Sequence, residues 1–137
     1  MMLFSQAHGL PVLTPSGTDE IGVVRALTVD AAAGRVTHLR VRTGRRAETV
    51  LPWEAVHAVG PGAVVVGPAG APDEVAPHHD LLGRRVLTET GDRHGTVRDV
   101  AFDPATGRIE AVRTTLGTLP ADRLVGLGDY ALVVRAD

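Results

Sequence analysis

The chain has 137 residues, of which 44% are apolar and 22% are charged, and its formal net charge is −2. This composition is typical of a globular protein, and the near-neutral charge does not indicate a DNA-binding protein. The absence of cysteine excludes disulfides and thiolate catalysis. The start of the chain does not have the pattern of a signal peptide, and the apolar runs are shorter than the ~20 residues that span a bilayer. We therefore expect a cytoplasmic protein without direct membrane insertion.

The first half of the chain has the pattern of a small β-structure. Residues 23–29, VVRALTV, are apolar and β-branched, and residues 35–42, RVTHLRVR, alternate between apolar and polar. The segment 30–34 between them has the residues of a type I turn that ends in a left-handed glycine, which predicts a tight hairpin. Pro52 cannot donate a hydrogen bond to a strand ladder, so one strand should end there, and residues 63–66, AVVV, should form the last strand.

The second half of the chain repeats this pattern. Three pairs of segments match in order: 12–14 with 86–88, 22–36 with 95–109, and 51–66 with 119–134. Residues 67–79, between the copies, are rich in Pro, Gly and Ala, as linkers are. We therefore predict a first unit at 1–66, a linker at 67–79 and a second unit at 80–137. Each unit has five or six short strands, which predicts an all-β fold of two tandem small antiparallel barrels.

The ordered motifs resemble the PRC-barrel family. The resemblance rests on residues 81–112, LLGRRVLTETGDRHGTVRDVAFDPATGRIEAV, and on the first-copy segments 22–41 and 51–60, the latter reading LPWEAVHAVG. This small barrel occurs in the H subunit of photosynthetic reaction centres and in the ribosome maturation factor of the small subunit. The resemblance implies a role as a binding or adaptor module without naming the partner. The second copy departs from the first where Ala121 and Asp122 replace Trp53 and Glu54.

Candidate sites for chemistry are weak throughout. The densest histidine cluster is His78-His79-Asp80, which lacks the closed four-ligand set of a structural zinc site. The Asp-x-x-x-Gly turns offer one carboxylate each, too few for a calcium loop. No Gly-x-Ser-x-Gly elbow and no Gly-rich loop followed by Lys-Ser/Thr occurs. We therefore expect no metal, no cofactor and no enzymatic activity.

A basic constellation in the first copy is the candidate partner-binding site. His38, Arg40 and Arg42 share one face of a strand, and an Arg pair lies in the hairpin that follows. Together with Trp53 and Glu54 they form the candidate set, listed here in full: His38, Arg40, Arg42, Arg45, Arg46, Trp53 and Glu54. Either these arginines are a solvated strand face, or they recognise an acidic protein surface or an RNA backbone.

Two places remain open for Trp53, which does not recur in the second copy. It lies either in the contact between the copies or on the surface as an anchor for a partner. Our first functional hypothesis is a non-enzymatic adaptor that docks a protein partner through the first copy. The alternative is an RNA- or ribosome-associated factor, and a third is small-ligand binding between the barrels. Homo-oligomers are compatible with the sequence, and the packing of the copies within one chain or between chains is left open.

Overall fold

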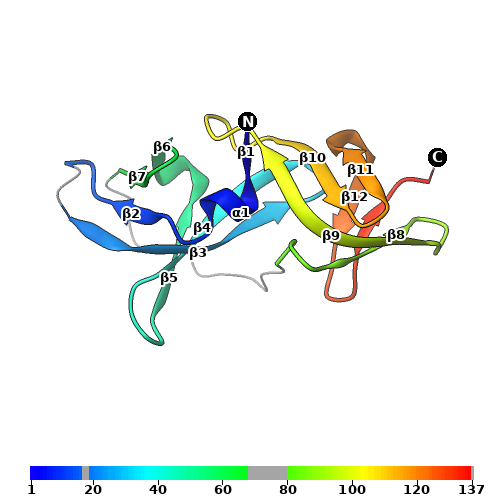
Figure 1. Ribbon diagram of the computed structural model, residues 1–137, viewed down its shortest axis with the longest axis horizontal. Helices are drawn as coiled ribbons and strands as arrows, with labels where there is room; N and C mark the ends of the chain where they lie inside the picture. Colours follow the sequence, from blue (N-terminus) through cyan, green and yellow to red (C-terminus); the bar gives the residue numbers. More distant parts are fainter. Residues whose placement is uncertain (17–18, 68–79, 137) are drawn as a thin grey trace.

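The computed structural model describes residues 1–16, 19–67 and 80–136, and most of its regular secondary structure is β-strand (Figure 1). The first copy contains nine elements: β1 (Met2–Leu3), α1 (Phe4–Ala7), β2 (Pro11–Leu13), β3 (Glu20–Asp30), β4 (Arg35–Arg42), β5 (Glu48–Pro52), the 3-10 turn η1 (Trp53–Ala55), β6 (Val56–Val59) and β7 (Val64–Val66). The second contains seven: β8 (Arg85–Thr88), β9 (Arg93–Phe102), β10 (Ile109–Thr114), β11 (Gly117–Pro120), the 3-10 turn η2 (Ala121–Arg123), β12 (Leu124–Leu127) and β13 (Leu132–Val134). The predicted all-β tandem repeat is confirmed.

The strand order is the same in the two copies. It runs β5-β4-β3-β2-β7-β6 in the first sheet and β11-β10-β9-β8-β13-β12 in the second. All neighbours are antiparallel except two pairs, β2 with β7 and β8 with β13, which are parallel. The predicted small antiparallel barrels therefore each contain one parallel pair, whose two strands are not joined by a hairpin. The turns η1 and η2 join β5 to β6 and β11 to β12. Each described sheet curls towards a barrel and stays open between the strands that these turns join.

The predicted hairpin turns are present in both copies. Asp30 Oδ1 accepts a hydrogen bond from Ala33 N at 3.1 Å, and Asp103 Oδ1 accepts one from Ala105 N at 2.8 Å. The turns end at Gly34 and Gly107, whose φ values are +68° and +79°. Such left-handed backbone favours glycine, and it directs the chain into the second strand of each hairpin.

These two hairpin ends meet each other and join the copies. Val36 N donates to Gly107 O at 2.7 Å, and Ile109 N donates to Gly34 O at 2.8 Å. Residues 34 and 36 match residues 107 and 109 in the repeat, so the two hydrogen bonds are equivalent by a local two-fold axis. Buried side chains from both copies form one hydrophobic core cluster. The two copies therefore pack on each other within one chain.

The beginning of each copy lies against the other copy. β1 pairs with β9 of the second copy, with Met2 opposite Phe102, and Ser5 N donates to Asp99 Oδ1 at 3.1 Å. Reciprocally, Asp80 at the start of the second copy contacts the first copy through Arg40. The predicted linker lies, apart from Gly67, outside the described residues.

Candidate functional site

Trp53 lies in the contact between the copies. η1 holds its side chain at 7% exposure, and the indole packs edge-on against Phe102 with ring centroids 6.2 Å apart. Phe102 in turn packs edge-on against Phe4 at 5.2 Å. A Cβ placed on Gly107 would come within 2.6 Å of Trp53 Nε1, so the indole also covers that turn. Of the two places considered for Trp53, the structure therefore selects the contact between the copies, and Trp53 does not belong to an exposed docking surface.

The side chain of Arg40 is also buried. Its side chain is 7% exposed and makes two ion pairs, with Glu48 on the neighbouring strand and with Asp80 Oδ1 at 2.9 Å. Asp80 opens the second copy, so this ion pair joins the copies as Trp53 does. A buried guanidinium needs such carboxylate partners because its desolvation is otherwise unfavourable. Arg40 therefore has a structural role.

His38 and Glu54 do not join the remaining arginines. His38 is half-buried, and its Nδ1 lies 3.0 Å from Thr37 Oγ1. Glu54 is exposed on η1, at the Pro52 end of β5. The arginine-bearing hairpin starts at the other end of that strand, about 13 Å away at roughly 3.3 Å per residue. The predicted seven-residue set is therefore separated into distinct places.

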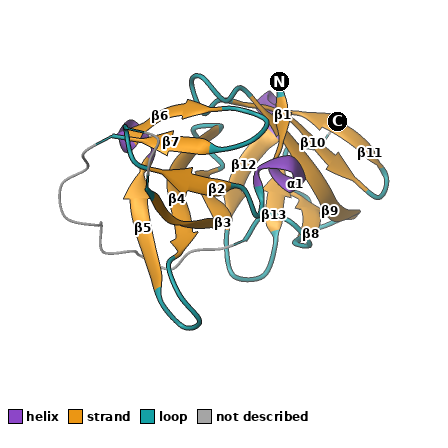
Figure 2. Ribbon diagram, turned by 60° about the vertical axis from the view of Figure 1, so that its left-hand side comes forward, coloured by secondary structure: helices purple, strands orange, loops and turns teal. Residues whose placement is uncertain are grey.

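Three of the predicted residues, Arg42, Arg45 and Arg46, come together in an exposed hollow. They lie at the end of β4 and in the β4–β5 hairpin, which Thr43 N closes by donating to Ala47 O at 2.9 Å. Figures 1 and 2 show this hairpin projecting from the body of the molecule. We call this place, lined by Arg25, Arg42, Gly44, Arg45, Arg46, Ala47 and Glu48, the arginine hollow.

Arg25 is the one arginine of the hollow that was not among the residues predicted from the sequence. It lies on β3, where the pairing with β4 shifts register between Val24 and Ala26, and this irregularity brings Arg25 to the arginine hollow. A tight hairpin around residues 30–34 places Arg25 near Arg40 to Arg42, so this part of the signal was present in the sequence. The register shift between Val24 and Ala26 could not be predicted from the sequence pattern.

The arginine hollow carries a strong excess of positive charge. Within the described part of the chain, none of its four guanidinium groups forms an ion pair, and its one carboxylate, Glu48, is bound to Arg40. The second copy has no counterpart, because β10 and β11 are joined by a short turn in which Thr114 pairs with Gly117. The hollow is therefore a feature of the first copy and is not required by the barrel.

The comparison with protein families agrees with the geometry of both copies. The model of the PRC-barrel domain matches the chain twice, over residues 1–71 and 73–136. The chain belongs to the PRC-barrel family. Apart from β1, which joins the second sheet, each match covers one of the two sheets, so the protein is a tandem arrangement of two PRC-barrel domains. A search of curated proteins found no significant match.

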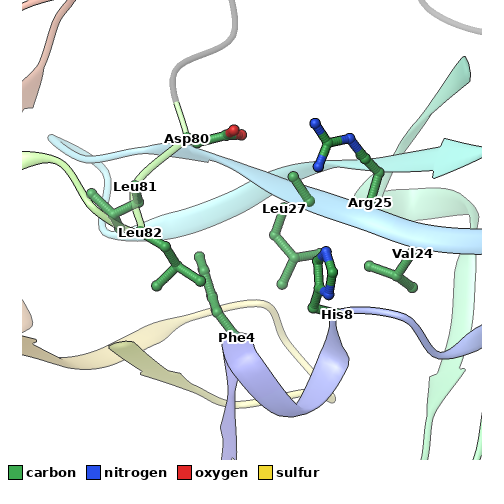
Figure 3. A pocket seen from close by; sticks show the side chains of 9 residues that line it. Phe4, His8, Val24, Arg25, Leu27, Asp80, Leu81 and Leu82 are labelled. Atoms are coloured by element: carbon green, nitrogen blue, oxygen red, sulfur yellow. The ribbon is translucent and has the colours of Figure 1, made fainter. Parts of the chain in front are cut away.

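The contact between the two PRC-barrel domains contains a small cavity (Figure 3). Its volume is about 170 Å³, and its walls come from β3, from the start of the chain and from Asp80 to Leu82. Pockets for small organic ligands usually measure ~300–1,000 Å³. This cavity is too small to support the third hypothesis, small-ligand binding between the barrels, and the larger hollow of about 450 Å³ between Val59, Gly60, Pro61 and Pro104 is open to solvent.

Neither a metal-binding cluster nor a membrane-spanning helix is present in residues 1–16, 19–67 and 80–136. These ranges contain no group of three or more His, Asp or Glu side chains placed to hold a metal ion. His78 and His79 lie outside those ranges. No helix in them is both long enough and apolar enough to cross a bilayer.

Proposed function

We propose that this tandem PRC-barrel chain is a non-enzymatic interaction module whose arginine hollow binds an acidic segment of a partner protein. The observation that carries the proposal is the convergence of Arg25, Arg42, Arg45 and Arg46 on one exposed hollow without an ion pair in the described part of the chain. Guanidinium groups donate paired hydrogen bonds to carboxylates, and arginine is enriched at protein interfaces. The lining supplies cationic donors, and its one carboxylate, Glu48, is held by Arg40, which supports binding over catalysis.

RNA offers phosphates that the same guanidinium groups would bind. Single-stranded RNA is usually held by stacking of its bases on exposed aromatic side chains as well. Three of the four aromatic side chains, Phe4, Trp53 and Phe102, are buried in the contact between the copies. The fourth, Tyr130, belongs to the second copy. This distribution favours an acidic protein segment over RNA.

The test compares two labelled probes, a short peptide rich in Asp and Glu and an oligouridylate, by fluorescence anisotropy with the full chain. We expect Arg45→Ser/Arg46→Ser to weaken binding of the acidic peptide by roughly tenfold, since each exposed charge pair contributes about 0.2–1 kcal/mol. The matched control is Arg98→Ser/Arg113→Ser, which removes two exposed arginines from the second copy and should leave binding within about twofold.

Three results would contradict the proposal. The first is equal binding by the hairpin variant and the wild type. The second is equal weakening by the control variant, which would mean that only the total charge of the chain matters. The third is tighter binding of oligouridylate than of the peptide, with a steep decrease in affinity as salt is raised, which would assign the arginine hollow to RNA.

A further inference from the structure

The second copy carries an exposed hollow of its own, built around the fourth aromatic residue. Tyr130 is 64% exposed and precedes β13. Arg85 on β8 lies over its ring, with Cζ 4.4 Å from the ring centroid, and Arg85 Nη1 donates to the Tyr130 hydroxyl at 2.7 Å. Arg93 at the start of β9 lines the same hollow, which has a volume of about 500 Å³. We call this place the tyrosine hollow.

The tyrosine hollow offers both cationic donors and apolar surface. No carboxylate lines it. Arg85 donates one of its five N–H groups to Tyr130, and Arg93 is exposed, so several N–H donors remain accessible to a ligand. Arg85 covers one face of the Tyr130 ring, so the apolar part is the rest of that ring together with Leu116, which is 65% exposed. Leu116 lies at the rim, because a Cβ placed on Gly95 in the lining would be 3.2 Å from its Cγ.

The hydrogen bond between Arg85 and Tyr130 prepares the hollow for a ligand. It fixes the guanidinium against the ring, so less rotational freedom remains to be lost when an anion binds. Tyrosine and arginine together are the residue types most enriched among energetically dominant interface positions. The matched positions of the first copy are Pro11, Glu20 and Gly62, which cannot form such a pair. The barrel therefore does not need Arg85, Arg93 and Tyr130 for its own packing.

We propose that the tyrosine hollow binds an acidic segment of a partner protein that carries an apolar side chain beside its carboxylates. Arg85 and Arg93 receive the carboxylates, while Tyr130 and Leu116 cover the apolar side chain. Figure 1 shows β8 at the other end of the molecule from the β4–β5 hairpin, so the tyrosine hollow is separate from the arginine hollow. A chain with both hollows binds two acidic segments at once and so connects the two partner proteins that carry them.

The experiment maps binding by amide chemical shifts of the full ¹⁵N-labelled chain. The probe is a short peptide with one Phe between Glu and Asp residues, and two matched peptides replace either the Phe by Ala or the acidic residues by their amides. We expect the probe to shift amides at 83–85, 93–96 and 129–131. We expect Arg85→Gln/Arg93→Gln and Tyr130→Ala each to weaken this site by about tenfold. Shifts near the arginine hollow should persist in both variants.

The control Arg98→Gln/Arg113→Gln removes two exposed arginines of the same copy and should leave the shifts unchanged. The proposal is overturned if the amide-substituted peptide binds as well as the probe, or if the two hollow variants bind as the wild type does. Tighter binding of oligouridylate than of the probe at these amides would also overturn it, in favour of nucleic acid. Shifts confined to the arginine hollow would overturn the tyrosine hollow alone and leave the proposed function standing.

Discussion

Replacement of Trp53 by alanine tests the contact between the two copies. Alanine is the residue at the matched position 121 of the second copy, so the barrel itself tolerates it. Burial of an indole removes about 150–250 Å² from water, which at about 25 cal/mol per Å² gives roughly 4–6 kcal/mol as an upper bound. Measured truncations of buried aromatic side chains destabilise proteins by about 3–5 kcal/mol. Because Trp53 is 7% exposed and packs on Phe102, we expect a loss of about 3–4 kcal/mol.

The assay is urea unfolding followed by far-ultraviolet circular dichroism, because the substitution removes the only tryptophan of the chain. For a chain of this size we also expect the melting temperature to decrease by about 10 °C. The control is Tyr130→Ala, which removes an aromatic side chain that is 64% exposed and should change the free energy of unfolding by about 1 kcal/mol at most, because only its contact with Arg85 is lost. A loss below about 1 kcal/mol for Trp53→Ala would refute the role of the indole in joining the copies.

Two further predictions use matched positions of the repeat. Gly34→Ala should destabilise the chain by about 1 kcal/mol through left-handed backbone strain alone, because nothing lies within 4 Å of the new Cβ. Gly107→Ala should destabilise it by about 1–2 kcal/mol more, because the new Cβ meets Trp53. Urea unfolding should show that this additional loss disappears when Trp53 is also replaced by alanine. Arg40→Ala should lower the free energy of unfolding by about 1–2 kcal/mol, which is less than for a fully buried ion pair because the carboxylate partners stay partly hydrated. The control Arg113→Ala, at an exposed position, should lower it by less than about 0.5 kcal/mol. Equal losses would contradict the structural role of Arg40.

The repeat and the hairpins could be predicted because their signals are local. The turn ending at Gly34 and the one ending at Gly107 each lie within five residues, and the strands around them show apolar patterning. The parallel pairing of β2 with β7 could not be predicted, because it joins segments about fifty residues apart and no local pattern distinguishes it from an antiparallel pair.

The candidate site was predicted only in part for the same reason. Alternation along β4 correctly placed Arg40 and Arg42 on one face, but it could not reveal that Asp80, forty residues later, covers Arg40. Arg42, Arg45 and Arg46 were found because they are close in sequence. Arg25 was missed because its approach depends on a register shift. The tyrosine hollow gathers residues from positions 85, 93 and 130, a set that only the folded chain brings together.

The local two-fold contact at Gly34 and Gly107 has a consequence for how such a protein can diversify. In a pair of identical subunits with this contact, every substitution would occur at two positions, one on each side of the axis. Covalent fusion of the two units removes that constraint, since one side can accept a bulky indole while the other keeps a methyl group. The same freedom lets each unit develop a different outer surface. The shared contact thus supplies a fixed frame on which one short chain carries two unlike outer faces.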